Sequence, residues 1–335
     1  MFSNEPKRIS LARLPTPIQK LEKLIALFGG PELYIKRDDL TGIGLSGNKV
    51  RKLEYLLADA KDQGADTLIT CGGIQSNHSR ATAIAATQNG MDSVLVLRGK
   101  RETPYDGNVL LDKLVGAEIR LVTPEQYAQR IDQIMEQVGQ ELRDQGRRPY
   151  VIPEGGSNPI GVWGYIRASG EIKDQLEEMN LKVDAVVTAV GSGGTQAGLL
   201  IGGKLSDLGA RVVGFNVCDT AKHFQARIGR LVAETIEKYA LPCQIFPDEI
   251  LLVDGYVGRG YALSRPQELK LIKTVARQEG VFLDPVYTGK ALFGLADQIR
   301  RGRFKKGEKI LFLHTGGIFG LFVQEKREGL FPGKA

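Results

Sequence analysis

A lysine stands at the junction between a glycine-rich turn and an expected helix. Lys49 follows Ser46, Gly47 and Asn48, which are residue types that commonly precede a helix. The positive potential of a helix N-terminus disfavours an ammonium ion, so an amine placed there is expected to have a lowered pKa. A neutral amine is the form that condenses with a carbonyl carbon to give a Schiff base. An exposed helix lysine is the ordinary alternative for a lone residue, so the interpretation depends on the other motifs.

A second candidate site is the loop of residues 191–195, which joins an expected strand to an expected helix. Its members are Gly191, Ser192, Gly193, Gly194 and Thr195. Glycines allow several backbone N–H groups to converge on a phosphate, and the helix N-terminus adds positive potential. A plain strand–helix turn is the alternative without a ligand. Gly191 and Gly193, with Asp219 after the next strand, also partly match a dinucleotide-binding fingerprint, but Gln196 occupies the position of its third glycine.

Two further segments place polar side chains at the start of a helix. The first is residues 75–78, whose members are Gln75, Ser76, Asn77 and His78. Free N–H groups at such a helix start suit a carboxylate or a phenolate, whereas simple N-capping is the alternative. The second is residues 284–290, a turn into another helix that contains Tyr287 and Thr288. Tyr261 lies in a glycine-rich segment upstream, and each tyrosine taken alone is usually a packing residue.

The composition predicts a well-packed protein of one large or two smaller domains. The chain has 335 residues, of which 42% are hydrophobic, and it contains 41 glycines. No apolar run approaches the length needed to cross a bilayer, and the first residues lack the apolar segment of a secretory signal. Residues 300–306 supply part of the net charge of +6. No nucleic-acid-binding motif accompanies them, so we expect neither a nucleic acid nor a membrane as partner.

The cysteines and histidines favour neither a disulfide framework nor a metal centre. Cys71, Cys218 and Cys243 form no C-x-x-C pair and are odd in number, which favours reduced thiols in the cytoplasm. Cys71 has no evident basic partner and is expected to be a buried strand thiol. The three histidines show no metal-ligand spacing. We therefore expect a cytoplasmic protein without a bound metal.

Short apolar runs alternate with helical patterns through most of the chain. Expected strands cover residues 33–35, 67–71, 93–97, 119–122, 149–152, 185–190, 212–217 and 309–314. This alternation predicts an α/β fold with two open, twisted, mostly parallel sheets flanked by helices. We expect a large domain from residues 1–53 and 165–335, with residues 54–164 inserted as a small α/β domain. Ligands of open α/β sheets bind at the carboxyl ends of strands, so the active site is expected in the interdomain cleft.

Taken together, these segments resemble one enzyme family. Residues 46–49, 75–78, 191–195 and 284–287 occur in the order found in the D-cysteine desulfhydrase and 1-aminocyclopropane-1-carboxylate (ACC) deaminase family. These enzymes depend on pyridoxal 5′-phosphate (PLP) and have the tryptophan-synthase-β fold type. The resemblance covers nearly the whole chain. It implies PLP as cofactor, a small amino acid as substrate, and a homodimer.

The resemblance also assigns the cofactor contacts. Lys49 would carry PLP as a Schiff base, Asn77 would hydrogen-bond the 3′-oxygen of the cofactor, and residues 191–195 would hold its phosphate. Thr288 and Thr315 would also belong to the cofactor site.

The same resemblance assigns the substrate contacts. Ser76 would contact the substrate carboxylate or take part in proton transfer, with Asn77 and His78 beside it. Tyr261 and Tyr287 would lie on either side of the substrate. Lys49 or a group near Ser76 and the tyrosines would remove the proton from Cα, and the sequence leaves that choice open.

Two positions separate the subfamilies that the chain resembles. Where ACC deaminases have Glu and Leu, this chain has Thr288 and Thr315, as D-cysteine desulfhydrases do. A carboxylate beside the pyridine nitrogen keeps it protonated and strengthens the electron sink, whereas a neutral hydroxyl does so less. Opening a cyclopropane ring is expected to need the stronger sink.

We therefore expect a carbon–sulfur lyase that converts D-cysteine and water into pyruvate, sulfide and ammonia. ACC deaminase and L-cysteate sulfo-lyase are the alternatives within the family. A dinucleotide-dependent oxidoreductase and a binding protein without turnover are the alternatives outside it.

Overall fold

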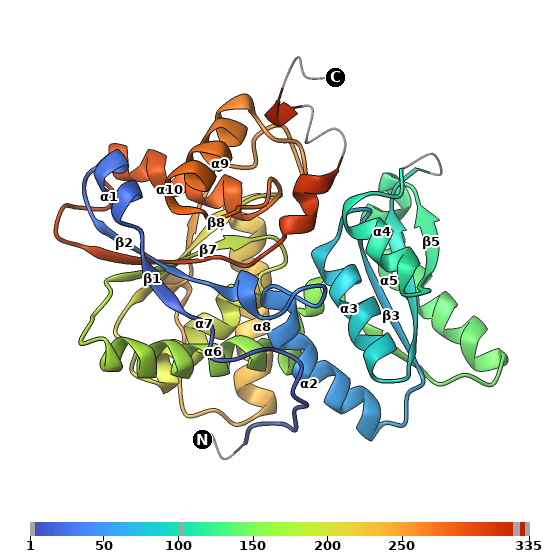
Figure 1. Ribbon diagram of the computed structural model, residues 1–335. Helices are drawn as coiled ribbons and strands as arrows, with labels where there is room; N and C mark the ends of the chain where they lie inside the picture. The colour runs from blue at the N-terminus through green and yellow to red at the C-terminus, as the bar shows by residue number, and fades with distance from the viewer. Residues whose placement is uncertain (1–3, 101–103, 324–328, 332–335) are drawn as a thin grey trace.

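The computed structural model describes residues 4–100, 104–323 and 329–331. Figure 1 shows two α/β units side by side, with helix α2 (Asn48–Asp62) running between them. The larger unit is built on a six-stranded sheet with the order β1-β2-β10-β7-β8-β9, and the smaller one on a four-stranded sheet with the order β5-β4-β3-β6. The predicted fold class is therefore observed.

Both sheets are mostly parallel, as the alternation of strands and helices predicts. The strands of the larger sheet are β1 (Ile18–Lys20), β2 (Glu32–Lys36), β7 (Ala185–Val190), β8 (Arg211–Asn216), β9 (Leu251–Val253) and β10 (Lys309–Leu313). Only the edge strand β1 is antiparallel to its neighbour. The strands of the smaller sheet are β3 (Thr67–Gly73), β4 (Asp92–Arg98), β5 (Glu118–Val122) and β6 (Pro149–Ile152), and all their pairs are parallel.

Helices cover both faces of the larger sheet. Besides α2, the helices are α1 (Glu22–Phe28), α3 (Asn77–Gln88), α4 (Gly107–Leu114), α5 (Pro124–Asp144), α6 (Pro159–Glu178), α7 (Gly194–Leu205), α8 (Ala221–Lys238), α9 (Pro266–Glu279) and α10 (Thr288–Arg300). Short 3-10 turns are η1 (Asp38–Leu40), η2 (Glu154–Gly156), η3 (Pro247–Glu249) and η4 (Ile318–Phe322). Along β7, Val186 packs with α6, α7 and α8, whereas Ala185 and Val187 pack with α1, α9 and α10. This alternation is the period of two expected for a strand that is buried on both faces.

The expected domain boundaries fall inside two helices. Residues 53 and 54 lie within α2, and residues 164 and 165 lie within α6. Both helices therefore run from one expected domain into the other. The division of the chain at these positions stays a prediction.

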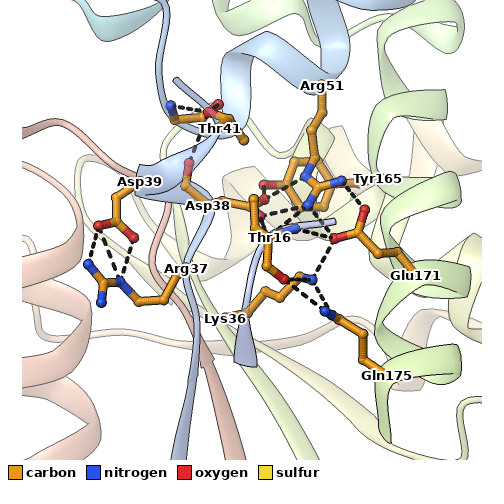
Figure 2. A network of polar contacts seen from close by, with 11 residues as sticks. Thr16, Lys36, Arg37, Asp38, Asp39, Thr41, Arg51, Tyr165, Glu171 and Gln175 are labelled. Atoms are coloured by element: carbon orange, nitrogen blue, oxygen red, sulfur yellow. Dashed lines mark hydrogen bonds and ion pairs between the residues drawn. The ribbon is translucent and has the colours of Figure 1, made fainter. Parts of the chain in front are cut away.

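A buried polar network fixes the first turns of α2 against the larger unit (Figure 2). Arg51 donates to both carboxylate oxygens of Asp38 at 2.8 Å and to those of Glu171 on α6 at 2.8 and 2.9 Å. Lys36 of β2 joins the network through Glu171. Burial would raise the pKa of Asp38, but Arg51, Lys36 and Tyr165 together more than offset this, and the pKa is lowered. The network therefore sets the position of α2 and of the lysines on either side of Arg51.

Candidate active site

A cleft lies where the two units meet, at the carboxyl ends of β3 and β7. About 790 Å³ of space lies within the cleft and its open mouth. Most predicted site residues line it: Lys49, Ser76, Asn77, His78, Gly191, Ser192, Gly193, Thr195, Tyr261, Tyr287 and Thr315. Segments that are far apart in the sequence thus meet at one site.

Two predicted residues do not line the cleft. Gly194 is the first residue of α7 and is buried behind the loop. Thr288 is fully buried, and its hydroxyl donates to Asp284 Oδ1 at 2.7 Å while accepting from the Asp284 N–H at 2.9 Å. The structure corrects the expectation that Thr288 faces the cofactor beside Thr315. Its side chain is turned inward because Asp284 caps the start of α10 by accepting from the N–H of Thr288.

Lys49 is the second residue of α2, so its predicted position at a helix start is confirmed. Gly47 precedes the helix with φ of +92°, and a Cβ there would lie 2.7 Å from the Thr315 carbonyl oxygen. The Lys49 Nζ donates to the Gly155 carbonyl at 3.3 Å. Burial lowers the pKa of Lys49 to about 8, against the opposing effect of the Glu154 carboxylate. In this structure burial is thus the main cause of the lowered pKa, where the sequence suggested the helix N-terminus.

Lys52, one turn along α2, is the second candidate for the lysine that holds the cofactor, and it is buried next to the cleft without lining it. Its Nζ donates to the Gly155 carbonyl at 3.2 Å and to Ser157 Oγ at 3.3 Å. The side chain is fully buried, and burial, Lys49 and Arg227 lower its pKa well below the ordinary value. No carboxylate pairs with it among the described residues. Burying an ammonium without a counter-charge is costly, so an anion beside this lysine would be favourable.

The β7–α7 loop lies next to Lys52. A Cβ added at Gly194 would lie 2.7 Å from the Lys52 Nζ. Gly193 has φ of +86° and caps α7, and its missing side chain makes room for Ile228 of α8, which would lie 2.8 Å from a Cβ. Thr195 Oγ1 accepts from Asn48 Nδ2 at 3.0 Å.

These features fit the two ends of PLP. The helix start, the loop hydroxyls and the Lys52 amine, whose charged form a neighbouring anion would favour, suit a phosphate. The low-pKa amine of Lys49 suits an aldehyde. A dinucleotide-binding loop has a glycine, without a side chain, at the position of Gln196. Here the Gln196 side chain donates to the Leu251 carbonyl at 2.9 Å, and a Cβ on Gly214 would lie 2.3 Å from it. The dinucleotide interpretation therefore fits less well.

The β3–α3 turn supplies the polar wall of the smaller unit. Ser76 caps α3, since its Oγ accepts from the Ser79 N–H at 3.1 Å. Asn77 Oδ1 accepts from Asn108 Nδ2 at 3.2 Å. His78 is buried, and burial together with the nearby charges of Lys49 and Lys52 lowers its pKa well below the ordinary value. His78 is therefore neutral at neutral pH and does not act as a cation in the cleft.

Two more cleft residues were not predicted. Glu154 follows the carboxyl end of β6, and its Oε1 accepts from the Tyr127 hydroxyl at 2.7 Å. Its other oxygen lies 3.5 Å from Arg227 Nη1 on α8, so it links the two units. Cys218 follows β8, and burial raises the pKa of its thiol to about 12, so it stays protonated. Both residues follow the carboxyl end of a strand, which is where the ligand sites of open α/β sheets lie. That position in the sequence was the signal that could have identified them.

Of the parts of the chain that the structure describes, no helix combines the length and apolarity needed to cross a membrane. Within the same residues, no group of three or more His, Cys, Asp or Glu side chains is arranged to hold a metal ion. Cys71 is buried in β3 as a free thiol, which confirms its expected place as a buried strand residue.

Comparisons with known proteins give close relatives. Residues 9–316 match a family described as pyridoxal-phosphate dependent enzyme. A mitochondrial protein of Arabidopsis thaliana named bifunctional D-cysteine desulfhydrase/1-aminocyclopropane-1-carboxylate deaminase is 46% identical over 322 residues, which cover 93% of this chain and 79% of that protein. A putative 1-aminocyclopropane-1-carboxylate deaminase of Thermotoga maritima is 47% identical over 323 residues, covering 96% and 99% of the two chains.

Solved structures agree with the sequence relatives. The crystal structure of an ACC deaminase homologue matches with a TM-score of 0.88 and 43% sequence identity, over 96% of this chain and 95% of that one. A threonine deaminase isoform of Solanum lycopersicum matches with a TM-score of 0.63 and 18% identity, over 91% of this chain and 80% of that one. At that identity the second likeness shows a shared fold.

Proposed function

The chain belongs to the pyridoxal-phosphate dependent enzyme family, in the group of the D-cysteine desulfhydrases and ACC deaminases, and we propose that it is a D-cysteine desulfhydrase. Membership confirms PLP as the cofactor and the tryptophan-synthase-β-like fold that the sequence resemblance implied. The enzyme is thus a PLP-dependent lyase. Its preference for a carbon–sulfur bond is the proposal.

The observation that carries this proposal is the threonine at position 315. Thr315 lines the cleft, at a position where ACC deaminases resemble one another in having Leu. Glu154 is the only Asp or Glu among the described residues that line the cleft, and it is held by Tyr127 and Arg227. A cleft poor in carboxylates keeps the pyridine nitrogen less protonated, which weakens the electron sink. Expelling a thiolate from Cβ tolerates the weaker sink better than opening a cyclopropane ring.

The residues of this chain divide the work of the reaction. Lys49 would hold the cofactor, Asn77 and residues 191–195 would orient it, and Lys52 would balance the charge of its phosphate. PLP, when bound, supplies the electron sink for the pair released at Cα. A lowered pKa makes the Lys49 amine a suitable acceptor for the Cα proton at neutral pH.

The tyrosine hydroxyls would serve the leaving group. Tyr261 and Tyr287 remain protonated because burial raises the pKa of both above the ordinary value. A protonated hydroxyl donates a hydrogen bond or a proton to a departing sulfur, which a phenolate does not. The overall reaction balances as D-cysteine plus water giving pyruvate, hydrogen sulfide and ammonia.

The experiment that tests the proposal compares substrates on the purified enzyme. The specificity constant kcat/KM is measured for D-cysteine, ACC and L-cysteate, with sulfide, 2-oxobutyrate and sulfite as the respective products. We expect D-cysteine to have the highest value. A higher value for ACC or L-cysteate would overturn the substrate assignment and would identify the alternative that replaces it.

The assembly and location stay predictions. We expect a homodimer in the cytoplasm, with a small amino acid as the partner molecule and no nucleic acid. Light scattering on the purified protein measures the mass of the assembly against the 36.6 kDa of one chain.

A further inference from the structure

Asn77 has a side-chain amide that presents either an oxygen acceptor or an N–H donor to the cleft. The two ends look alike in shape but differ in chemistry, since only the N–H end hydrogen-bonds a phenolate oxygen. A chain of hydrogen bonds behind Asn77 decides which end faces the ligand. It begins at Arg80 on α3 and passes through Asn108 on α4.

Arg80 is the fixed starting point of this chain. The residue is fully buried, and its Nη2 donates to the Ser46 carbonyl at 3.1 Å. Its Nε donates to Asn108 Oδ1 at 3.0 Å. A guanidinium has only donors, so the end of Asn108 that faces it must be the oxygen. The orientation of the Asn108 amide is therefore determined by Arg80.

Asn108 passes this polarity on to the β3–α3 turn. It is 1% exposed, and its Nδ2 donates to the Gln75 carbonyl at 3.0 Å and to Asn77 Oδ1 at 3.2 Å. Its backbone N–H also donates to Gln75 Oε1 at 2.7 Å. The oxygen of Asn77 is thereby occupied. Its Nδ2 donates to no group among the described residues, and because Asn77 lines the cleft, we infer that this is the end that meets a ligand there.

We propose that Asn108 is a positioning residue that orients the Asn77 amide so that its N–H donates to the 3′-oxygen of PLP. The inference rests on the proposed function, which supplies the contact between Asn77 and PLP. If the Asn77 amide were reversed, its carbonyl oxygen would face the anionic 3′-oxygen of PLP. Its N–H group would then face the N–H group of Asn108. Neither arrangement is favourable in a buried site.

The substitution that tests this is Asn108→Asp. A carboxylate of nearly the same shape still accepts from Arg80, but it has no N–H to donate. Asn77 would then turn its own N–H toward position 108 and present its oxygen to the cleft. We expect the dissociation constant for PLP to rise at least about tenfold. We also expect the long-wavelength absorption of the bound cofactor to lose intensity at neutral pH, because the anionic 3′-oxygen loses a donor.

A double-mutant cycle separates positioning from a merely structural role. Asn77→Ala removes the amide that Asn108 orients, so Asn108→Asp added to it should change neither the PLP affinity nor the spectrum further. Full additivity of the two substitutions in both readouts would overturn the inference. Asn108→Ala repeats the cycle without a buried carboxylate, should Asn108→Asp fail to fold, and we expect a smaller change from it that is again absent in the Asn77→Ala background.

These readouts do not depend on the substrate. An enzyme that prefers ACC to D-cysteine would overturn the substrate assignment, while the PLP affinity and the spectra of the cycle would still decide the role of Asn108. If the effects of the two substitutions are additive while the wild type turns over D-cysteine normally, only the inference on Asn108 is overturned.

Discussion

The hydroxyl oxygens of Tyr261 and Tyr287 lie 2.7 Å apart in the wall of the cleft. Their rings meet edge to face, with centroids 6.0 Å apart and planes at 72°. One hydroxyl must donate to the other, so the pair has one proton left to offer to a ligand. Burial raises the pKa of Tyr261 to about 12, and the pair therefore stays neutral at neutral pH. These two residues act as one donor unit.

Removing either hydroxyl is expected to slow the reaction. Proton transfer from a positioned side chain contributes about 10²–10⁴-fold to a rate. We expect Tyr261→Phe and Tyr287→Phe each to lower kcat for D-cysteine at least about tenfold, and the double variant to lose little more than the worse single one. Tyr105→Phe is the matched control, since Tyr105 is exposed on the surface. Steady-state kinetics that show wild-type kcat in both site variants would contradict the assignment.

Thr315 is predicted to influence the choice of substrate. Thr315 lines the cleft, and Thr315→Leu replaces its hydroxyl with an apolar side chain without adding a charge. We expect this variant to lower the ratio of kcat/KM for D-cysteine to that for ACC relative to the wild type. An unchanged ratio would show that Thr315 does not determine the choice of substrate, although it would not by itself exclude the proposed function.

Thr288 is predicted to act on stability. It is fully buried and its hydroxyl is bonded to Asp284, so Thr288→Glu would bring a second carboxylate next to the first. We expect the melting temperature to fall by several degrees, because an unpaired buried charge is costly. Thr288→Ser keeps the hydroxyl and is expected to melt near the wild type. A Thr288→Glu protein as stable as Thr288→Ser would show that position 288 has access to the open cleft.

The pH dependence of cofactor capture should report the pKa of Lys49. Its ammonium loses a proton above a pKa of about 8, so the neutral amine and the rate of PLP attachment to the apoprotein should rise between pH 7 and pH 9. The Glu154 carboxylate raises that pKa, and Glu154→Gln should therefore move the midpoint to lower pH. Stopped-flow absorbance follows the rate. A midpoint that stays above pH 10 in the wild type would rule out a buried amine at this site.

The buried network around Arg51 should be needed for stability. Arg51→Met leaves the carboxylates of Asp38 and Glu171 without their guanidinium. We expect the free energy of unfolding to fall by about 3–5 kcal/mol, the usual cost of removing one partner of a buried ion pair. Arg143→Met removes one partner of an exposed pair with Glu136 and should cost less than about 1 kcal/mol. Urea unfolding compares the two, and equal losses would contradict the structural role of the network.

The sequence predicted strands correctly where the apolar runs were long enough to be recognised. Residues 67–71 were expected as a strand and lie within β3, and residues 185–190 were expected and found as β7. The strands β1 and β9 were missed because each has three residues, too few for an alternation to appear. The segments around Lys49, Ser76 and residues 191–195 were found because each joins a turn to a helix, which is where ligands of α/β sheets bind.

The rest of the site depends on contacts between distant segments. Lys52 comes next to the site only because the segment that contains Gly155 and Ser157 folds back onto α2. Asn108 lies on a separate helix from Asn77, and nothing local marks it as a partner. Thr288 follows Tyr287 directly, yet the start of a helix turns one side chain to the cleft and the other inward. Such differences arise from tertiary packing, which a single sequence does not display.

The assignment of Lys49 is tested most directly by locating the bound cofactor. Lys49 and Lys52 both donate to the Gly155 carbonyl, at 3.3 and 3.2 Å, so the two amines compete closely for the role. The holoenzyme is reduced with borohydride, digested, and its peptides are sequenced by mass spectrometry. We predict the reduced pyridoxyl group on Lys49, no such group in Lys49→Ala, and labelling of Lys49 with weakened PLP affinity in Lys52→Ala. A pyridoxyl group on Lys52 in the wild type, or a reducible adduct that persists in Lys49→Ala, would contradict the account.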